Sequence, residues 1–301
     1  MSLWIPITIA AAFLQNVRSA LQKHLKGMMG TTGATFVRFG FGFPFAVLFV
    51  FCLNRFAGYP LPEANRAFLI WVLVGGLSQI AATALLVHLF AFRNFAVGTA
   101  YSRTEPAQAA IFGLIFLGET VSSGVIGAIA MSVLGVMLIS VAHTGGGWRA
   151  LLTSVTSHTA LIGLASGTCF GVSAVAYRAA SLALAGPNFM MQAAFTLAYV
   201  TVFQTLIMVA WMAWREPGQF SAIKKAWRPS LVVGVSGACA SFGWFMAMTL
   251  QQAAVVKSLA QIELLFTFAS SVFFFGERIN RLEIAGCLLI VAGIVALVLL
   301  R

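Results

Sequence analysis

Aspartate is absent from this sequence of 301 residues, and its seven acidic residues are all glutamates scattered along the chain. Sites for magnesium, calcium or a nucleotide are built largely from clustered carboxylates or a glycine-rich phosphate loop, and the sequence offers neither. The four cysteines lie singly inside apolar stretches, so neither a disulfide framework nor a paired-cysteine metal site is predicted. We therefore expect no metal and no cofactor.

Charged residues are scarce as well, at 8% of the chain against 60% hydrophobic residues. A soluble domain does not need so much apolar sequence, so the solvent for most of this chain is lipid. The net charge of +11 would suggest nucleic acid for a soluble protein, but the basic residues lie mainly at the ends of apolar runs, where they meet phospholipid headgroups. We expect membrane lipids as partners and no nucleic acid.

The apolar runs are long enough to cross a bilayer, which takes about 20 residues of helix. They predict an all-α integral membrane protein of about ten spans. The expected spans are 3–23, 31–53, 67–91, 95–117, 121–142, 159–183, 187–213, 229–251, 254–275 and 282–300. The separators 54–66, 143–158 and 214–228 are long enough to be loops.

The chain contains an internal duplication. An offset of 158 aligns Gly76 with Gly234, Glu105 with Glu263, Gly118-Glu119 with Gly276-Glu277, and Gly135 with Gly293. Five spans per copy would make the second copy enter the membrane from the opposite side, which gives inverted repeats around a central cavity. The predicted division is a first repeat at 1–143, a linker at 144–158 and a second repeat at 159–301.

Two short turns carry a family resemblance. Leu117-Gly118-Glu119 and Phe275-Gly276-Glu277 stand at matching places, each before a glycine-rich apolar helix. With the duplicated five-helix units, they resemble the drug/metabolite transporter superfamily, and more narrowly its EamA-type ten-helix members, over essentially the whole chain. The resemblance implies a cavity formed mainly by spans 1, 3, 4, 6, 8 and 9. It also implies a small-molecule substrate, such as an amino acid, that is exported by alternating access from a bacterial inner membrane. Spans 5 and 10 are implied to be peripheral or to support the contacts of a homodimer.

Glu105 and Glu263 are the leading site candidates. Each lies near the middle of its span, where an ionisable group costs about 2.5–3.5 kcal/mol on insertion scales. They could bind a cationic substrate group, hold a buried arginine or take up a proton, and a fixed ion pair between helices has equal weight. Pro106 predicts a kink beside Glu105. Tyr101 and Gln108, at four residues before and three after Glu105, are predicted to share its face.

Further candidates are polar or aromatic groups within apolar spans. Arg38 lies about 10 Å along its helix, and is expected to pair with one of the two glutamates or with a substrate carboxylate. Arg103 is expected to pair with a neighbouring helix. The remaining predicted site residues are Gln15, Gln79 and Gln261, as cavity residues under the resemblance, and Tyr177 and Trp244, which could stack on a substrate.

Three basic side chains, Arg18, Arg178 and Lys257, lie nearer the ends of their spans and are expected to reach water. In the connections, ten lysines and arginines follow the odd-numbered spans and three lie on the other side. The positive-inside rule then places both termini outside, whereas the family resemblance implies cytoplasmic termini.

Two other function classes stay open beside a carrier. A channel or a lipid translocase is compatible with the pattern, although inverted repeats with charges at the midplane fit a carrier better. An intramembrane enzyme is less favoured, because the sequence has no HExxH, no GxSxG and no nucleotide loop. We expect no enzymatic activity.

Overall fold

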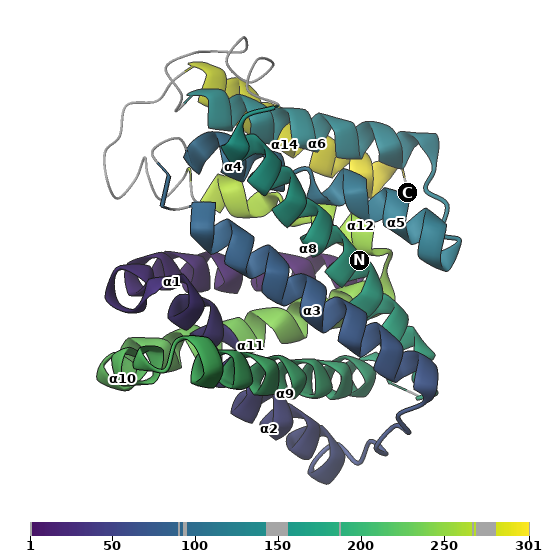
Figure 1. The fold of residues 1–301 in the computed structure, drawn as a ribbon. Coiled ribbons are helices and arrows are strands. Elements are labelled where there is room, and N and C mark those ends of the chain that lie inside the picture. The colour runs from purple at the N-terminus through teal and green to yellow at the C-terminus, as the bar shows by residue number, and fades with distance from the viewer. Residues whose placement is uncertain are drawn as a thin grey trace.

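In the computed structural model of this chain, all the secondary-structure elements of the described residues are helices (Figure 1). Six of the described helices are long and apolar enough to cross a membrane. The predicted all-α integral membrane fold is therefore confirmed. The described residues are 2–89, 91–92, 95–142, 156–186, 188–266, 268 and 281–300.

The first two expected spans are separated by a break at Gly30, inside the segment labelled α1. Helix α1 (Trp4–Gly40) consists of two helical segments that meet at Gly30, whose backbone is not helical and whose φ of 72° lies in the left-handed region that favours glycine. Helix α2 (Phe43–Arg55) follows, with a proline in its first turn. The second span therefore begins where it was expected, whereas the first extends beyond its expected end at residue 23, as far as the break at Gly30.

The later spans follow the expected ranges, with two of them split. The range 95–117 contains α4 and α5, and the range 254–275 is interrupted after α12. A short helix, α10, lies in the segment 214–228 that was expected to be a loop. The helices are α3 (Arg66–Leu89), α4 (Phe95–Ser102), α5 (Glu105–Leu117), α6 (Ser123–Ala142), α8 (His158–Ala183), α9 (Phe189–Arg215), α10 (Gly218–Lys225), α11 (Trp227–Leu250), α12 (Ala253–Leu259) and α14 (Arg281–Leu299).

The two splits fall at equivalent places of the repeats. The first lies at residues 103–104, between α4 and α5, and Pro106 follows it in the first turn of α5. The second lies at residues 260–261, after which residues 262–266 are helical. The offset of 158 that aligns Glu105 with Glu263 therefore also aligns the two breaks to within one residue. Matched helix breaks near the midplane are a feature of carriers built from inverted repeats.

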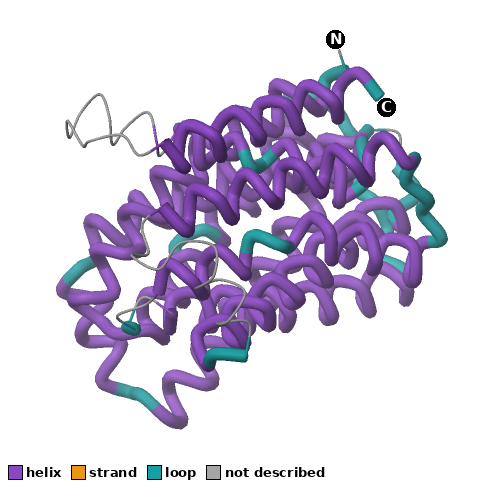
Figure 2. Tube along the Cα trace, turned by 90° about the horizontal axis from the view of Figure 1, so that it is seen from above, coloured by secondary structure: helices purple, strands orange, loops and turns teal. Residues whose placement is uncertain are grey.

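The helices form two groups on either side of α3 and α8 (Figure 1). Helices α6 and α14 pack side by side at one edge, and α9 and α2 pack together at the opposite edge. Helix α1 packs along α11, and α3 along α8. The start of α1 and the end of α14 lie at the same end of the molecule (Figure 2). The repeat boundaries at 143–158 lie largely outside the described residues and stay a prediction.

Small residues on α8 allow the broken helix α4–α5 to approach closely. A Cβ on Gly163 would collide with the backbone of Gly98, and a Cβ on Gly167 would lie 2.9 Å from the carbonyl oxygen of Ser102. Close backbone contact of this kind is how helices gain packing energy in lipid. The contact fixes the start of α5, and with it the position of Glu105.

Candidate functional site

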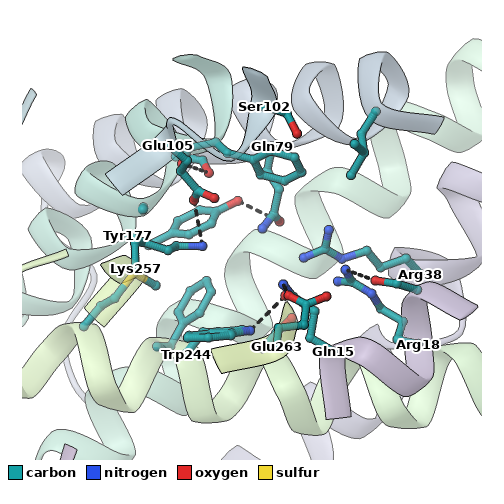
Figure 3. Close-up of a pocket in the computed structure, with 18 of the residues that line it drawn as sticks. Gln15, Arg18, Arg38, Gln79, Ser102, Glu105, Tyr177, Trp244, Lys257 and Glu263 are labelled. Atoms are coloured by element: carbon teal, nitrogen blue, oxygen red, sulfur yellow. Dashed lines mark hydrogen bonds and ion pairs between the residues drawn. The ribbon is translucent and has the colours of Figure 1, made fainter. Parts of the chain in front are cut away.

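A cavity of about 70 Å³ lies between the two repeats, at the level of the helix breaks (Figure 3). Its lining comes from α1, α3, α4, α5, α8, α11 and α12, from Arg103 in the first break and from Glu263 just after the second. Seven of the ten predicted site residues line it: Gln15, Arg38, Gln79, Glu105, Tyr177, Trp244 and Glu263. That these residues bind a substrate stays a prediction.

Glu105 forms an ion pair with Lys257 of α12. The Nζ atom of Lys257 lies 2.8 Å from Oε1 of Glu105, and both side chains are largely buried. Glu105 stands in the first turn of α5, where the positive end of the helix dipole favours a carboxylate. The ammonium group also lies 5.2 Å from the centre of the Trp244 ring, within range of a cation–π contact. The prediction that Lys257 reaches water is wrong, because this acidic and aromatic surrounding holds it inside.

Glu263 forms the second ion pair, with Arg103 at the other break. The Nη1 atom of Arg103 lies 3.1 Å from Oε2 of Glu263. Arg103 thus pairs with a residue of another helix, as the sequence predicted. Gln15 donates from Nε2 to the same carboxylate oxygen at 3.1 Å, and its Oε1 accepts from the indole Nε1 of Trp244 at 2.9 Å. A continuous polar chain thus runs from α11 through α1 to both breaks.

A second polar cluster lies on the α3 side of the cavity. The hydroxyl of Tyr177 lies 2.9 Å from the carbonyl oxygen of Gly75 and 3.0 Å from Oε1 of Gln79. Gln204, which sequence reasoning did not place in the site, donates to the same Gln79 oxygen at 2.9 Å. The Tyr177 ring stacks on Phe245 with a centroid distance of 4.5 Å. The ring of Tyr177 is therefore packed between Phe245 and the close backbone of Gly75, and its hydroxyl is held by α3.

Arg38 and Arg18 lie at one side of the cavity (Figure 3). Arg38 donates to Oγ1 of Thr83 at 3.2 Å. The predicted pairing of Arg38 with a glutamate is wrong, because Lys257 and Arg103 occupy the two carboxylates. Arg18 was expected to reach water, but α1 continues for more than ten residues beyond it, so it is buried in mid-helix.

Three predicted site residues do not line the cavity. The break at residue 103 changes the helical phase, so Tyr101 does not share a face with Glu105 and instead packs with Ala160. Gln108 donates to Oγ1 of Thr104 at 2.7 Å, and Gln261 donates to the carbonyl oxygen of Arg103 at 3.3 Å. Both glutamines therefore bond to residues of the first break, and Gln261 satisfies a backbone carbonyl there.

Arg178 joins the Gly118-Glu119 turn to the end of α11. Its Nε atom lies 2.5 Å from Oε1 of Glu119, and its Nη1 donates to the carbonyl oxygens of Met248 at 2.6 Å and Gln251 at 2.8 Å. Gly118 takes the left-handed conformation that ends α5, with φ of 65°. The expectation that Arg178 reaches water is wrong, since a carboxylate and helix-end carbonyls hold its guanidinium. The equivalent turn at 275–277 lies outside the described residues.

Comparison with known proteins gives a family match and a structural match. Residues 158–299 match the EamA-like transporter family. Among solved structures, 28 chains match; one of them, described as "Crystal structure of protein", aligns over 100% of this chain and 98% of its own with a TM-score of 0.74 and 16% identity. At that identity, the likeness shows the fold alone. No curated protein matches.

Proposed function

Because this chain belongs to the EamA-like transporter family through residues 158–299, we propose that it is a secondary carrier that moves a small organic metabolite across the membrane by alternating access. The family match makes it a multi-pass membrane transporter of the drug/metabolite type. The amino-acid character of the cargo, the export direction, the bacterial inner membrane and a homodimer are further parts of the proposal.

The observation that carries the proposal is the crossed pairing of the two glutamates. Glu105 of the first repeat pairs with Lys257 of the second, and Glu263 of the second pairs with Arg103 of the first. Both pairs lie on the cavity wall at matched helix breaks. Ion pairs that connect the two halves can separate or exchange partners as the halves move, and this makes them suitable coupling elements for a carrier.

The size of the cavity supports alternating access over a permanent pore. A volume of about 70 Å³ has room for a few water molecules, whereas most small-molecule sites enclose about 300–1,000 Å³. A metabolite therefore needs the two halves to separate on one side before it enters. The structure fits a nearly occluded state of such a cycle.

A lipid translocase is the second candidate, and one feature favours it. An apolar groove of about 640 Å³ lies between α5 and α6 and extends to Glu119. Its wall includes Ile111, Leu114 and Leu134, all of which are exposed on the outer surface of the bundle. An acyl chain could occupy such a groove. It does not reach the ion pairs of the central cavity, so we favour the carrier.

Solute counterflow in liposomes tests the proposal. The purified protein should exchange a labelled internal amino acid for an external one with saturable kinetics, and Glu105→Gln and Glu263→Gln should each reduce the rate at least tenfold while the protein still folds. Glu63→Gln is the matched control, because Glu63 is an exposed carboxylate outside the cavity. Normal rates in both cavity variants would refute the coupling role. Movement of a labelled phospholipid without solute exchange would favour the translocase.

A further inference from the structure

The charges of the cavity wall do not balance. Its described lining residues include four cationic side chains and two carboxylates. Arg103 and Lys257 each have a carboxylate partner. In the described part of the chain, Arg18 and Arg38 have no carboxylate oxygen within 4.0 Å. The wall therefore carries two guanidinium groups that no described carboxylate contacts.

These two guanidinium groups lie together and deep in the protein. Arg18 is 5% exposed and Arg38 is 6% exposed. Gly237 of α11 lies against both, since a Cβ there would be 3.3 Å from Cδ of Arg18 and 3.7 Å from Cγ of Arg38. Figure 3 shows both side chains at the same side of the cavity, near Gln15 and Glu263. Glycine at position 237 leaves the space that the two arginine stems occupy.

The hydrogen-bonding capacity of this pair is only partly used. Arg18 makes one long contact from Nη2 to the hydroxyl of Ser19, at 3.4 Å. Its Nε and Nη1 atoms have no hydrogen-bond partner among the described residues. Arg38 bonds to Thr83 and its guanidinium lies 5.3 Å from the Phe39 ring centre. A buried donor without an acceptor is costly, and two adjacent like charges without a counter-ion cost more.

We infer that Arg18 and Arg38 form an anion subsite, and that the cargo of this carrier is an organic anion with a carboxylate or phosphate group. The inference rests on the proposed function and narrows its substrate class. A planar guanidinium fork matches the oxygens of either group, and an anion would neutralise the excess charge of the wall. The two glutamates already have cationic partners, so they are poorly placed to select a cation.

An internal rearrangement is the competing explanation. Glu263 is close enough to interact electrostatically with Arg18, and in another conformation it could leave Arg103 and pair with Arg18. The arginines would then serve the conformational change without binding cargo. This alternative predicts no preference for anionic ligands.

A series of ligands with one carbon skeleton and three charge states tests the inference. The probes are succinate, succinamide and 1,4-diaminobutane, with inorganic phosphate as a second anion, and the readout is the Tm of the detergent-purified protein at constant ionic strength. A ligand that binds only the folded state raises Tm. We expect succinate or phosphate to raise it, and the diamide and the diamine to have no effect.

Variants locate the subsite. Arg18→Gln and Arg38→Gln should each lower the affinity for the anion at least tenfold, because each removes charge-assisted hydrogen bonds. Arg228→Gln, at an exposed position against Trp227, should bind as the wild type does. Arg38→Lys keeps the charge and loses the fork, so it should keep the preference for anions at lower affinity. If the glutamine variants fail to fold, the charge series on the wild type still decides.

The outcomes separate this inference from the proposed function. Equal stabilisation by succinamide and succinate, or no stabilisation by either anion, overturns the anion subsite, and counterflow of a neutral or cationic solute would then leave the carrier proposal intact. Stabilisation by phosphatidylglycerol in the micelle, with none by soluble anions, would support the subsite and identify a lipid headgroup as its ligand. If the wild-type protein exchanges no solute in the counterflow assay, the proposal that it is a carrier is refuted.

Discussion

Glu105 and Glu263 occupy equivalent positions of the two repeats, and each forms its ion pair with the opposite repeat. Lys257 lies 2.8 Å from Glu105, and Arg103 lies 3.1 Å from Glu263. Each cation stands at or beside the helix break of its own half. Two reciprocal pairs therefore connect the broken helices across the cavity, and neither break is stabilised by its own repeat alone.

The first prediction concerns the free energy of the Glu105–Lys257 pair. Lys257→Met alone should destabilise the protein by about 3–5 kcal/mol, because it leaves a buried carboxylate without a partner. The double variant Glu105→Gln with Lys257→Met should recover much of that loss, since no unpaired charge remains. Unfolding of the detergent-purified variants as a double-mutant cycle measures the coupling. Additive effects of the two substitutions would show that the pair does not couple the repeats.

The position of Glu105 could be predicted from the sequence, but the identity of its cationic partner could not. The offset of 158 aligned the two glutamates at the midplane without any structural information. The choice between Arg38 and Lys257 as the partner of Glu105 depends on which helices of opposite repeats face each other, and periodicity within one helix does not contain that information. For the same reason, the contacts of Arg178 with Glu119 and the end of α11 could not be predicted from the sequence.

Arg18 was missed for a different reason. The predicted end of the first span at residue 23 placed Arg18 within snorkelling distance of water, whereas the helical segment that carries Arg18 continues to the break at Gly30. Tyr101 shows the converse error, because the helical spacing to Glu105 assumed a continuous helix through the break at residue 103. Boundaries and breaks, which depend on tertiary packing, limited the site prediction more than composition or repeat detection did.

The second prediction tests the contact between α8 and α4. Gly163→Ala should prevent normal folding or lower Tm strongly, because its Cβ would overlap the backbone of Gly98, which cannot move without shifting α4. Gly127→Ala is the control, since a Cβ at Gly127 meets no atom within 4 Å. By helix propensity, this control should be neutral or stabilising by up to about 1 kcal/mol. Similar Tm values for the two variants would contradict the packing.

The third prediction concerns Arg178 and the Gly118-Glu119 turn. Arg178→Lys keeps the charge but cannot reach Glu119 and the carbonyl oxygens of Met248 and Gln251 together, as the guanidinium does. We expect a loss of about 2–3 kcal/mol of stability, in line with hydrogen bonds to a charged group. The control is Arg55→Lys, at an exposed position at the end of α2, which should unfold as the wild type does. An unchanged Tm for Arg178→Lys would mean that this turn is not held by the arginine.

The fourth prediction separates structure from cargo binding at Tyr177. Tyr177→Phe keeps the stacking on Phe245 and removes only the hydroxyl that lies between Gly75 and Gln79. Its loss should cost about 1–2 kcal/mol of stability. If the hydroxyl also contacts the cargo, the apparent KM for counterflow should rise while the maximal rate changes little, because the ion pairs at the breaks remain intact. Tyr199→Phe, at a partly exposed ring that packs against Phe68 outside the cavity, is the matched control. A lower maximal rate with an unchanged KM would instead place Tyr177 in the conformational change, through the contact between α3 and α8.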